Sequence, residues 1–217
     1  AARASNNLAS VAHLRGRPEI AIGLYRAALL SYQRLGDRRG AAETWHNLGL
    51  CFRQMADLRE AAGAALEAVR HAELTGLPAL LALSVLGRAE TDIERRDFEL
   101  ARRDIARAAK LAEAAADPLC AAEVQRVRAL AALRQEDFAT ACREADQACA
   151  IAIRHGSALL AAECAAVSAL ACQGLGQTTE AARLREQALD GFERLHARPL
   201  IQRFDDTWKV RSEERRV

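Results

Sequence analysis

The feature that most constrains the fold is a set of small residues that recurs every 40 positions, with no insertion or deletion. Three columns carry this period: Ala9, Gly49, Ala89, Ala129 and Ala169; Ala21, Ala61, Ala101, Ala141 and Ala181; and Ala28, Ala68, Ala108, Ala148 and Ala188. A constant period of this length is typical of repeat proteins, in which each repeat is one supersecondary unit. The period therefore predicts five equivalent units instead of independently folded domains.

The composition indicates that these units are helical. Of the 217 residues, 50 are Ala and 29 are Arg, whereas there are only 4 Pro and 12 Gly, and aromatic residues make up 4%. Ala, Leu, Arg and Glu are strong helix formers, and the shortage of β-branched and aromatic residues argues against a β-sandwich or barrel. Positive and negative charges nearly balance, at a net +2, so we expect no nucleic-acid binding by this chain.

Residues that begin or end helices recur in the same register. Aspartates that can cap a helix start, glycines that can end one in a left-handed conformation, and prolines suited to a first helical position all lie at the boundaries. They are Asp57, Asp97 and Asp137; Gly36, Gly76 and Gly156; Pro78 and Pro118; and the further candidate N-caps Asp37, Asp117 and Ser157. Each unit is thus predicted to hold two helices, which the small columns allow to pack closely.

The second unit resembles the tetratricopeptide repeat. Trp45-x2-Leu48-Gly49-x2-Phe52, followed by Ala61 and Ala68, is similar to the pattern of that family. The first unit matches it through Leu8-Ala9 and Gly16-x4-Ala21, and the later units keep the small residues but lose the aromatic ones. The resemblance extends over nearly the whole chain. Its 40-residue period is longer than usual and is similar to that of adaptor proteins and sensor domains of bacterial regulators.

The resemblance implies an all-α solenoid, a right-handed superhelix whose first helices line a concave groove. We expect five units over residues 1–197, in a 40-residue register of about 2–41, 42–81, 82–121, 122–161 and 162–201. Pro199 opens a segment in which Leu200, Ile201, Phe204 and Trp208 share one helical face, which predicts a capping helix over 198–211. The charged residues 212–217 are expected to fray. The chain begins almost inside its first helix, which suggests an upstream domain or further repeats.

The resemblance also implies partner-binding residues along the groove: Asn7, His13, His46, Asn47, Leu50, Arg53, Glu90, Arg126 and Leu130. Asn7 and Asn47 occupy the same repeat position, and an amide side chain that donates and accepts can hold an extended peptide backbone. Arg53 and Arg126 could bind carboxylates bidentately, although a simple surface charge is the more common role for each of them. In the later units Val127, Leu133, Val167 and Leu170 form either core or an apolar patch with Leu130.

No set of residues indicates catalysis, a metal site or a cofactor. The five His are scattered, and the six Cys contain no C-x-x-C pair, so we expect reduced thiols in the cytoplasm. Gly174 and Gly176 lack the lysine and the strand of a phosphate-binding loop. No apolar run is long enough to cross a membrane.

Two functions remain open. The first is a non-enzymatic scaffold that binds a protein or peptide in its groove. The alternative is a domain cut from a larger bacterial signalling or transcription regulator that senses a peptide or a small-molecule effector. The oligomeric state does not follow from the sequence.

Overall fold

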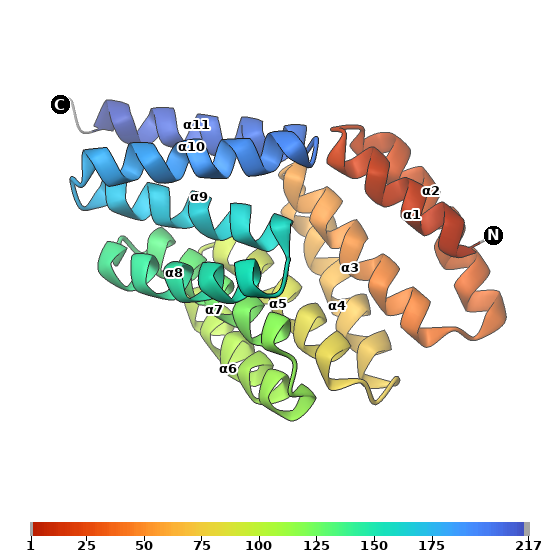
Figure 1. Cartoon of the computed structure of the whole chain (residues 1–217). Helices are drawn as coiled ribbons and strands as arrows, with labels where there is room; N and C mark the ends of the chain where they lie inside the picture. Colours follow the sequence, from red (N-terminus) through yellow and green to blue (C-terminus); the bar gives the residue numbers. More distant parts are fainter. Residues whose placement is uncertain (1, 215–217) are drawn as a thin grey trace. The chain divides into compact units, whose positions relative to one another are not determined.

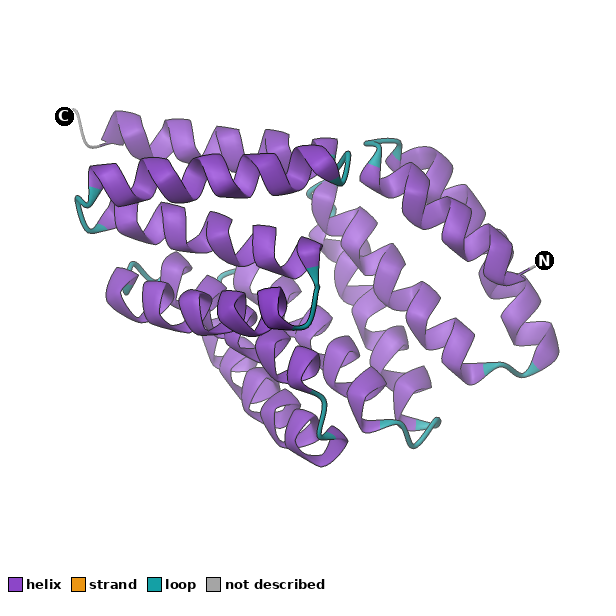
Figure 2. Ribbon diagram, viewed as in Figure 1, coloured by secondary structure: helices purple, strands orange, loops and turns teal. Residues whose placement is uncertain are grey.

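The computed structural model describes residues 2–214, which form eleven α-helices and no strand (Figures 1 and 2). The helices are α1 (Ala2–Leu14), α2 (Pro18–Leu35), α3 (Arg38–Gln54), α4 (Leu58–Glu73), α5 (Pro78–Glu94), α6 (Phe98–Ala115), α7 (Pro118–Arg134), α8 (Phe138–Arg154), α9 (Ala158–Gly174), α10 (Thr178–Arg194) and α11 (Arg198–Glu214). The fold is an all-α solenoid of helical hairpins, as expected from the repeat pattern.

The chain divides into two compact units, which meet within α7: unit 1 ends at Cys120 and unit 2 begins at Ala121. In unit 1 the hairpins α1–α2, α3–α4 and α5–α6 follow one another, and the second helix of each hairpin contacts the first helix of the next. In unit 2, α9 packs between α8 and α10, and α11 contacts both α9 and α10.

The three small-residue columns lie where helix backbones approach each other. All fourteen alanines in these columns are at most 1% exposed, and Gly49 is buried as well. A Cβ built on Gly49 would lie 3.8 Å from the Ala61 carbonyl oxygen and 3.8 Å from the Ala64 Cβ, which is ordinary van der Waals contact. The first column therefore packs against the second helix of its own hairpin, and a side chain larger than a methyl group would force the helices apart.

A residue in the left-handed conformation ends each of the first ten helices. Their φ values lie between 50° and 79°, and they recur every 20 positions: Gly16, Gly36, Ala56, Gly76, Arg96, Ala116, Glu136, Gly156, Gly176 and His196. The predicted glycines are confirmed, but five of these positions carry a side chain, so composition alone could not reveal the series. In most of these turns the next amide bonds to the carbonyl five residues back, as Asp57 does to Phe52 at 2.9 Å, which satisfies a helix-end carbonyl.

The aspartate caps form as predicted. The side chains of Asp37, Asp57, Asp97 and Asp137 accept hydrogen bonds from the amides of Gly40, Glu60, Leu100 and Thr140, and Asp117 accepts from Leu119 and Cys120. Pro78 and Pro118 begin α5 and α7. The prediction for Ser157 was wrong in one respect, because this residue stands at the N-cap of α9 but its hydroxyl makes no capping hydrogen bond.

The predicted C-terminal helix is present as α11, and it is longer than expected. Phe204 is 5% exposed and its ring lies 6.5 Å from Phe192 of α10, centroid to centroid, in an edge-to-face arrangement. The Arg185 guanidinium of α10 lies 5.5 Å from the Trp208 ring centroid and donates to Asp205 at 2.6 Å. Residues 212–214, expected to fray, belong to α11, and 215–217 lie outside the described residues.

The left-handed residues that end the helices predict opposite effects on stability for substitutions in two successive turns, at Glu136 and at Gly156. Glu136→Gly should raise the free energy of unfolding by about 1 kcal/mol, because a Cβ is disfavoured at φ 63°. Gly156→Ala, at φ 70°, should lower it by about 1 kcal/mol for the same reason. Urea unfolding followed by circular dichroism measures both.

Gly63 provides the control, because it lies inside α4 with no atom within 4 Å of a built Cβ. Gly63→Ala should stabilise the protein by about 1 kcal/mol through helix propensity. The explanation would fail if Gly156→Ala stabilised the protein as Gly63→Ala does.

Candidate functional site

One face of α3 is half-buried along its length. Of the residues expected to line the groove, His46, Asn47, Leu50 and Arg53 lie on this face. Glu43 and Gln54 lie on it as well, and the six residues are called here the α3 stripe. Between them, Thr44, Leu48 and Cys51 are at most 1% exposed. The stripe follows the spacing of one helical face, so the rest of α3 anchors it in the core of unit 1.

Polar contacts tie α1 to α3 beside this stripe. The Thr44 hydroxyl donates to the Asn6 amide oxygen at 3.1 Å, and His13 Nδ1 lies 2.8 Å from the Cys51 Sγ. Burial lowers the pKa of His13, and the Arg53 charge lowers it further. Asn7 is exposed on α1, one position from Asn6.

The His13–Cys51 pair is not arranged for nucleophilic chemistry. Burial raises the pKa of the Cys51 thiol to about 12, and the sulfur side chain is fully buried. A thiol is a nucleophile only as a thiolate, and catalytic cysteines have lowered pKa values and access to substrate. This contact therefore serves packing between α1 and α3.

Arg53 makes polar contacts with α5. Its guanidinium forms an ion pair with Glu90 of α5 and donates to the Gly87 carbonyl at 3.1 Å. The two side chains are only 6% and 10% exposed. Arg53 and Glu90 therefore bind each other in this structure. The two residues carry opposite charges at groove positions of neighbouring repeats, and this is the sequence signal that could have predicted the pair.

His46 also packs between the two hairpins. A Cβ built on Gly87 would come within 2.8 Å of His46 Nδ1, so the imidazole lies directly against the α5 backbone. Glycine at position 87 thus makes room for His46. Asn47 and Leu50, one and four residues further along α3, keep partial exposure on the stripe.

Two of the predicted residues belong to unit 2. Arg126 Nε lies 2.8 Å from a Glu123 oxygen and 3.7 Å from a Glu163 oxygen, and its side chain is 15% exposed. Leu130 is half-buried. The apolar residues predicted as either core or patch are core: Val127, Leu133, Val167 and Leu170 are between 0 and 8% exposed.

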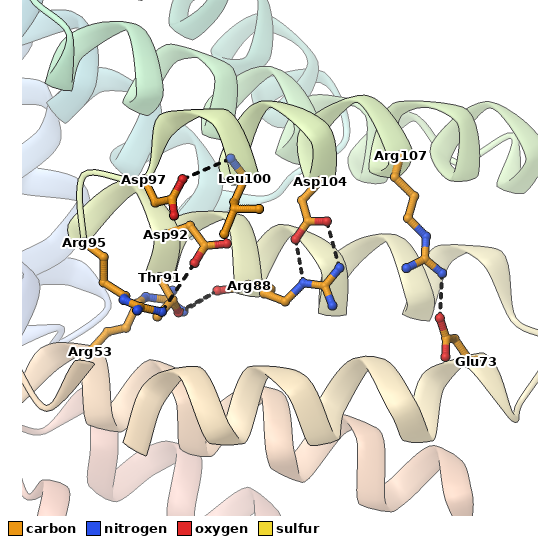
Figure 3. Close-up of polar contacts among 11 residues, drawn as sticks. Arg53, Glu73, Arg88, Thr91, Asp92, Arg95, Asp97, Leu100, Asp104 and Arg107 are labelled. Carbon is orange, nitrogen blue, oxygen red and sulfur yellow. Dashed lines mark hydrogen bonds and ion pairs between the residues drawn. The ribbon is translucent and has the colours of Figure 1, made fainter. Parts of the chain in front are cut away.

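Polar side chains form a network between α5 and α6 that the sequence pattern did not indicate (Figure 3). Arg88 donates to both carboxylate oxygens of Asp104 at 2.6 and 2.8 Å, and Asp92, 7% exposed, lies 3.9 Å from an Arg95 nitrogen. Burial raises the pKa of Asp92, and the neighbouring Asp104 raises it further. The equivalent positions 12, 52, 132 and 172 carry Ala, Phe, Ala and Cys, so this carboxylate stands where other repeats place small or apolar side chains.

The buried ion pair between Arg53 and Glu90 predicts that removing the Arg53 side chain strongly destabilises the protein. Arg53→Ala should lower the free energy of unfolding by about 3–5 kcal/mol, because Glu90 is left as a buried charge. The double variant Arg53→Met with Glu90→Leu should recover much of this loss. Equilibrium urea unfolding measures each variant.

Arg39→Ala is the control, since Arg39 pairs with Glu43 at the surface and its side chain is 68% exposed. Its removal should leave stability nearly unchanged. An Arg53→Ala variant as stable as the Arg39→Ala variant would contradict the buried role of Arg53.

The raised pKa of Asp92 predicts that Asp92→Asn stabilises the protein in a pH-dependent way. Its folded-state pKa lies above its ordinary value of 3.8, so its ionised form costs stability once the pH rises through the folded pKa. Asp92→Asn removes this cost and should raise the melting temperature at neutral pH. The gain should vanish at pH values below 3.8, where the carboxyl is protonated in both states.

Melting temperatures across this pH range test the effect. Asp190→Asn, on an exposed ion pair with Arg194, is the control and should show no gain at neutral pH. A gain from Asp92→Asn that persists undiminished at the acidic end would refute the assignment to ionisation.

The residues that the structure describes show neither a metal site nor a membrane-spanning helix. Among residues 2–214 no group of three or more His, Cys, Asp or Glu side chains is placed to hold a metal ion. None of the helices in that range combines the length and the apolar character needed to cross a membrane.

The comparisons with known proteins identify tetratricopeptide repeats in the first third of the chain. The tetratricopeptide repeat model matches residues 1–73, which contain the first two hairpins. With five consecutive helical hairpins of the same period, the molecule is a helical repeat protein. The match over residues 1–73 agrees with the resemblance to the tetratricopeptide repeat that the second unit predicted. No curated protein matches the sequence significantly.

Solved structures share the fold at low sequence identity. A Rap protein complexed with competence and sporulation factor aligns with 96% of this chain at 13% identity and a TM-score of 0.76, and this chain spans only 64% of that protein. BtubC (BKLC) from P. vanneervenii aligns over 87% of this chain and 78% of its own, at 18% identity and a TM-score of 0.61. Kinesin light chain TPR-like repeats from Podosopora anserina align over 89% and 95%, at 16% identity and a TM-score of 0.57.

Proposed function

We propose that this chain is a non-enzymatic scaffold that binds an extended segment of a partner protein along the first helices of its hairpins. The observation that carries the proposal is the α3 stripe, on which the partly accessible Asn47 and Leu50 lie beside the buried Thr44, Leu48 and Cys51. A surface held in place by a packed core binds with little loss of conformational entropy.

The stripe and its neighbour α1 offer the groups that such a segment needs. Asn7 and Asn47 occupy equivalent repeat positions, and each amide can donate to and accept from a peptide backbone. Leu50, beside Asn47 on the same face, offers an apolar contact for a side chain. His46 is held against Gly87, and the Arg53–Glu90 pair fixes α3 to α5, so these residues would position the binding surface.

The remaining predicted residues receive narrower roles. Arg126 and Leu130 are proposed as contacts of unit 2, with Arg126 already oriented by Glu123 and Glu163. His13, half-buried against Cys51, is proposed to border the surface as a neutral ring, in agreement with its lowered pKa. The high pKa of the Cys51 thiol supports a binding role without chemistry.

Ligand sensing is the second candidate, and the likeness to the Rap protein favours it. That protein was solved in a complex with competence and sporulation factor, and 96% of this chain aligns with 64% of the Rap protein. If this chain senses a peptide or small molecule in a larger bacterial regulator, binding must change the stability or arrangement of the hairpins. A scaffold needs no such change. We also propose a cytoplasmic location, which the six free cysteines support.

The stripe predicts a loss of binding without a loss of stability. A random peptide library displayed on phage is selected on the chain, and the dissociation constant of a selected peptide is measured by fluorescence anisotropy. Asn47→Ala and Leu50→Ala should each weaken binding about tenfold while the melting temperature stays nearly constant.

Gln33→Ala, an exposed position on α2, is the matched control and should bind as the unaltered chain does. The proposal is wrong if peptides are selected whose affinity depends on neither Asn47 nor Leu50. Hydrogen exchange with and without the peptide separates the two candidates, because a sensor should gain protection far from the stripe.

A further inference from the structure

Two cysteines meet where the fourth hairpin packs on the fifth. The second helix of the fourth hairpin, α8, lies beside α9, the first helix of the fifth, and both belong to unit 2 (Figure 1). Cys142 Sγ of α8 lies 3.5 Å from Cys172 Sγ of α9, although the two residues are 30 positions apart in the sequence. A disulfide bond is about 2 Å long, so each sulfur has to move by less than about 1 Å to form one.

Contacts on both sides of the sulfurs hold the two helices in register. One turn before Cys142, the Phe138 ring packs against Gly174, where a built Cβ would come within 2.5 Å of the ring. One turn after Cys142, the Asp146 carboxylate accepts a hydrogen bond from the Ser168 hydroxyl at 2.7 Å. These contacts run antiparallel along α8 and α9 and enclose the two cysteines. The short distance between the sulfurs is therefore set by the packing of both helices.

The repeat pattern shows that packing alone does not require cysteine at these positions. Alanine stands at the position of Cys142 in two other repeats and at the position of Cys172 in two others: Ala62 and Ala182, and Ala12 and Ala132. A methyl group is thus sufficient there elsewhere in the chain. Two thiols in contact at one junction therefore call for a chemical explanation.

The two thiols differ in their access to solvent. Cys142 is half-buried, whereas Cys172 is only 6% exposed. A small oxidant that enters this junction therefore meets the Cys142 sulfur first. Cys172 is placed to react with Cys142 once the latter has been oxidised, because their sulfurs are already in contact.

The surroundings keep both thiols protonated at neutral pH. Burial raises the pKa of Cys142 to about 12, and burial also raises the pKa of Cys172. Asp146 raises the pKa of both thiols further, and from α10 Glu180 raises that of Cys172 while Arg183 lowers it. Because thiolates are the reactive form, oxidation of this pair is slow. A disulfide between thiols of high pKa is also hard to reduce, since no stabilised thiolate favours its opening.

We propose that Cys142 and Cys172 are a modification site, at which hydrogen peroxide forms a disulfide that joins the fourth hairpin to the fifth. The Cys142 thiolate attacks one peroxide oxygen and the O–O bond breaks, which leaves a Cys142 sulfenic acid, and the departing hydroxide takes up the thiol proton as water. The Cys172 thiolate then attacks the Cys142 sulfur, the S–O bond breaks, and the second hydroxide takes up the Cys172 proton. The two sulfurs together lose two electrons, and the peroxide is reduced to two molecules of water.

The disulfide restricts movement between two consecutive hairpins. It closes a long segment of chain, because its two cysteines are 30 positions apart, and a cross-link of this kind stabilises a protein mainly by constraining the unfolded chain. Excess thiol reduces the bond again, so the modification is compatible with a compartment that keeps cysteines reduced under ordinary conditions.

The test treats the full, reduced chain with hydrogen peroxide, alkylates the remaining thiols and maps linked peptides by mass spectrometry. Peptides that contain Cys142 and Cys172 should be found joined, and dithiothreitol should release them. The rate of joining should rise about tenfold per pH unit from neutral to mildly alkaline pH, because the thiolate fraction does so. The oxidised chain should melt several degrees above the reduced chain.

Cys149→Ala is the matched control for Cys142→Ala. Both cysteines are half-buried on α8, and alanine stands at each position in another repeat, at Ala109 and Ala62, so both variants should fold. The Cys149 sulfur, however, lies against the Ala161 carbonyl at 3.8 Å. Cys142→Ala should abolish the link and the rise in melting temperature on oxidation, whereas Cys149→Ala should retain both.

Three outcomes would overturn the proposal. The first is a link that joins other cysteines, within one chain or between two chains. The second is a loss of the link in Cys149→Ala as complete as in Cys142→Ala. The third is prolonged treatment at the alkaline end of the range that leaves both thiols reduced, or that takes Cys142 to a sulfinic acid without any link.

Discussion

The close approach of two helix backbones at the small-residue columns is the constraint on which the remaining structure depends. Because the column residues are Ala, or Gly at position 49, each first helix packs directly against the second helix of its hairpin. That contact sets how each helix is rotated about its own axis. It therefore decides which residues of α3 are buried with Leu48 and which stay accessible on the stripe with Asn47.

Hairpins in unit 1 are joined by polar contacts as well as by packing. Thr44 bonds to Asn6, Cys51 contacts His13, and Arg53 pairs with Glu90, each pair linking consecutive first helices. Buried polar pairs add little net stability, but they disfavour alternative registers in which their charges would be left unpaired. The candidate binding surface thus lies on helices whose relative positions are specified by charge and hydrogen bonding.

Much of the fold could be predicted because its signals are local. The columns, the aspartate caps and the proline starts depend on residues within one or two turns of each other, and they agree with the helices observed. The left-handed turns at Ala56 and Arg96 were not recognisable, since these residue types are common inside helices. Ser157 shows the reverse case, a suitable residue type whose hydroxyl makes no cap.

The candidate site was less predictable, because exposure depends on residues distant in the sequence. The resemblance to the tetratricopeptide repeat implied groove positions for Asn47, Leu50 and Arg53, and these three residues share one face of α3. It could not show that Arg53 is neutralised by Glu90, 37 residues away, or that Val127 and Leu170 are core. It also gave no reason to expect Asp92 in the interior between two helices.

The sequence by itself determined the helical repeat, its period and the sides on which the helices touch, because a strict period and local capping leave few alternatives. Only the tertiary structure decided which polar side chains became part of the interior and how far each residue is exposed. Leu8 and Leu48 occupy the same place in the same repeat, yet one is 60% and the other 1% exposed. The physical reason is that burial is a property of the neighbour that packs against a residue, and equivalent residues in a solenoid do not all have the same neighbour.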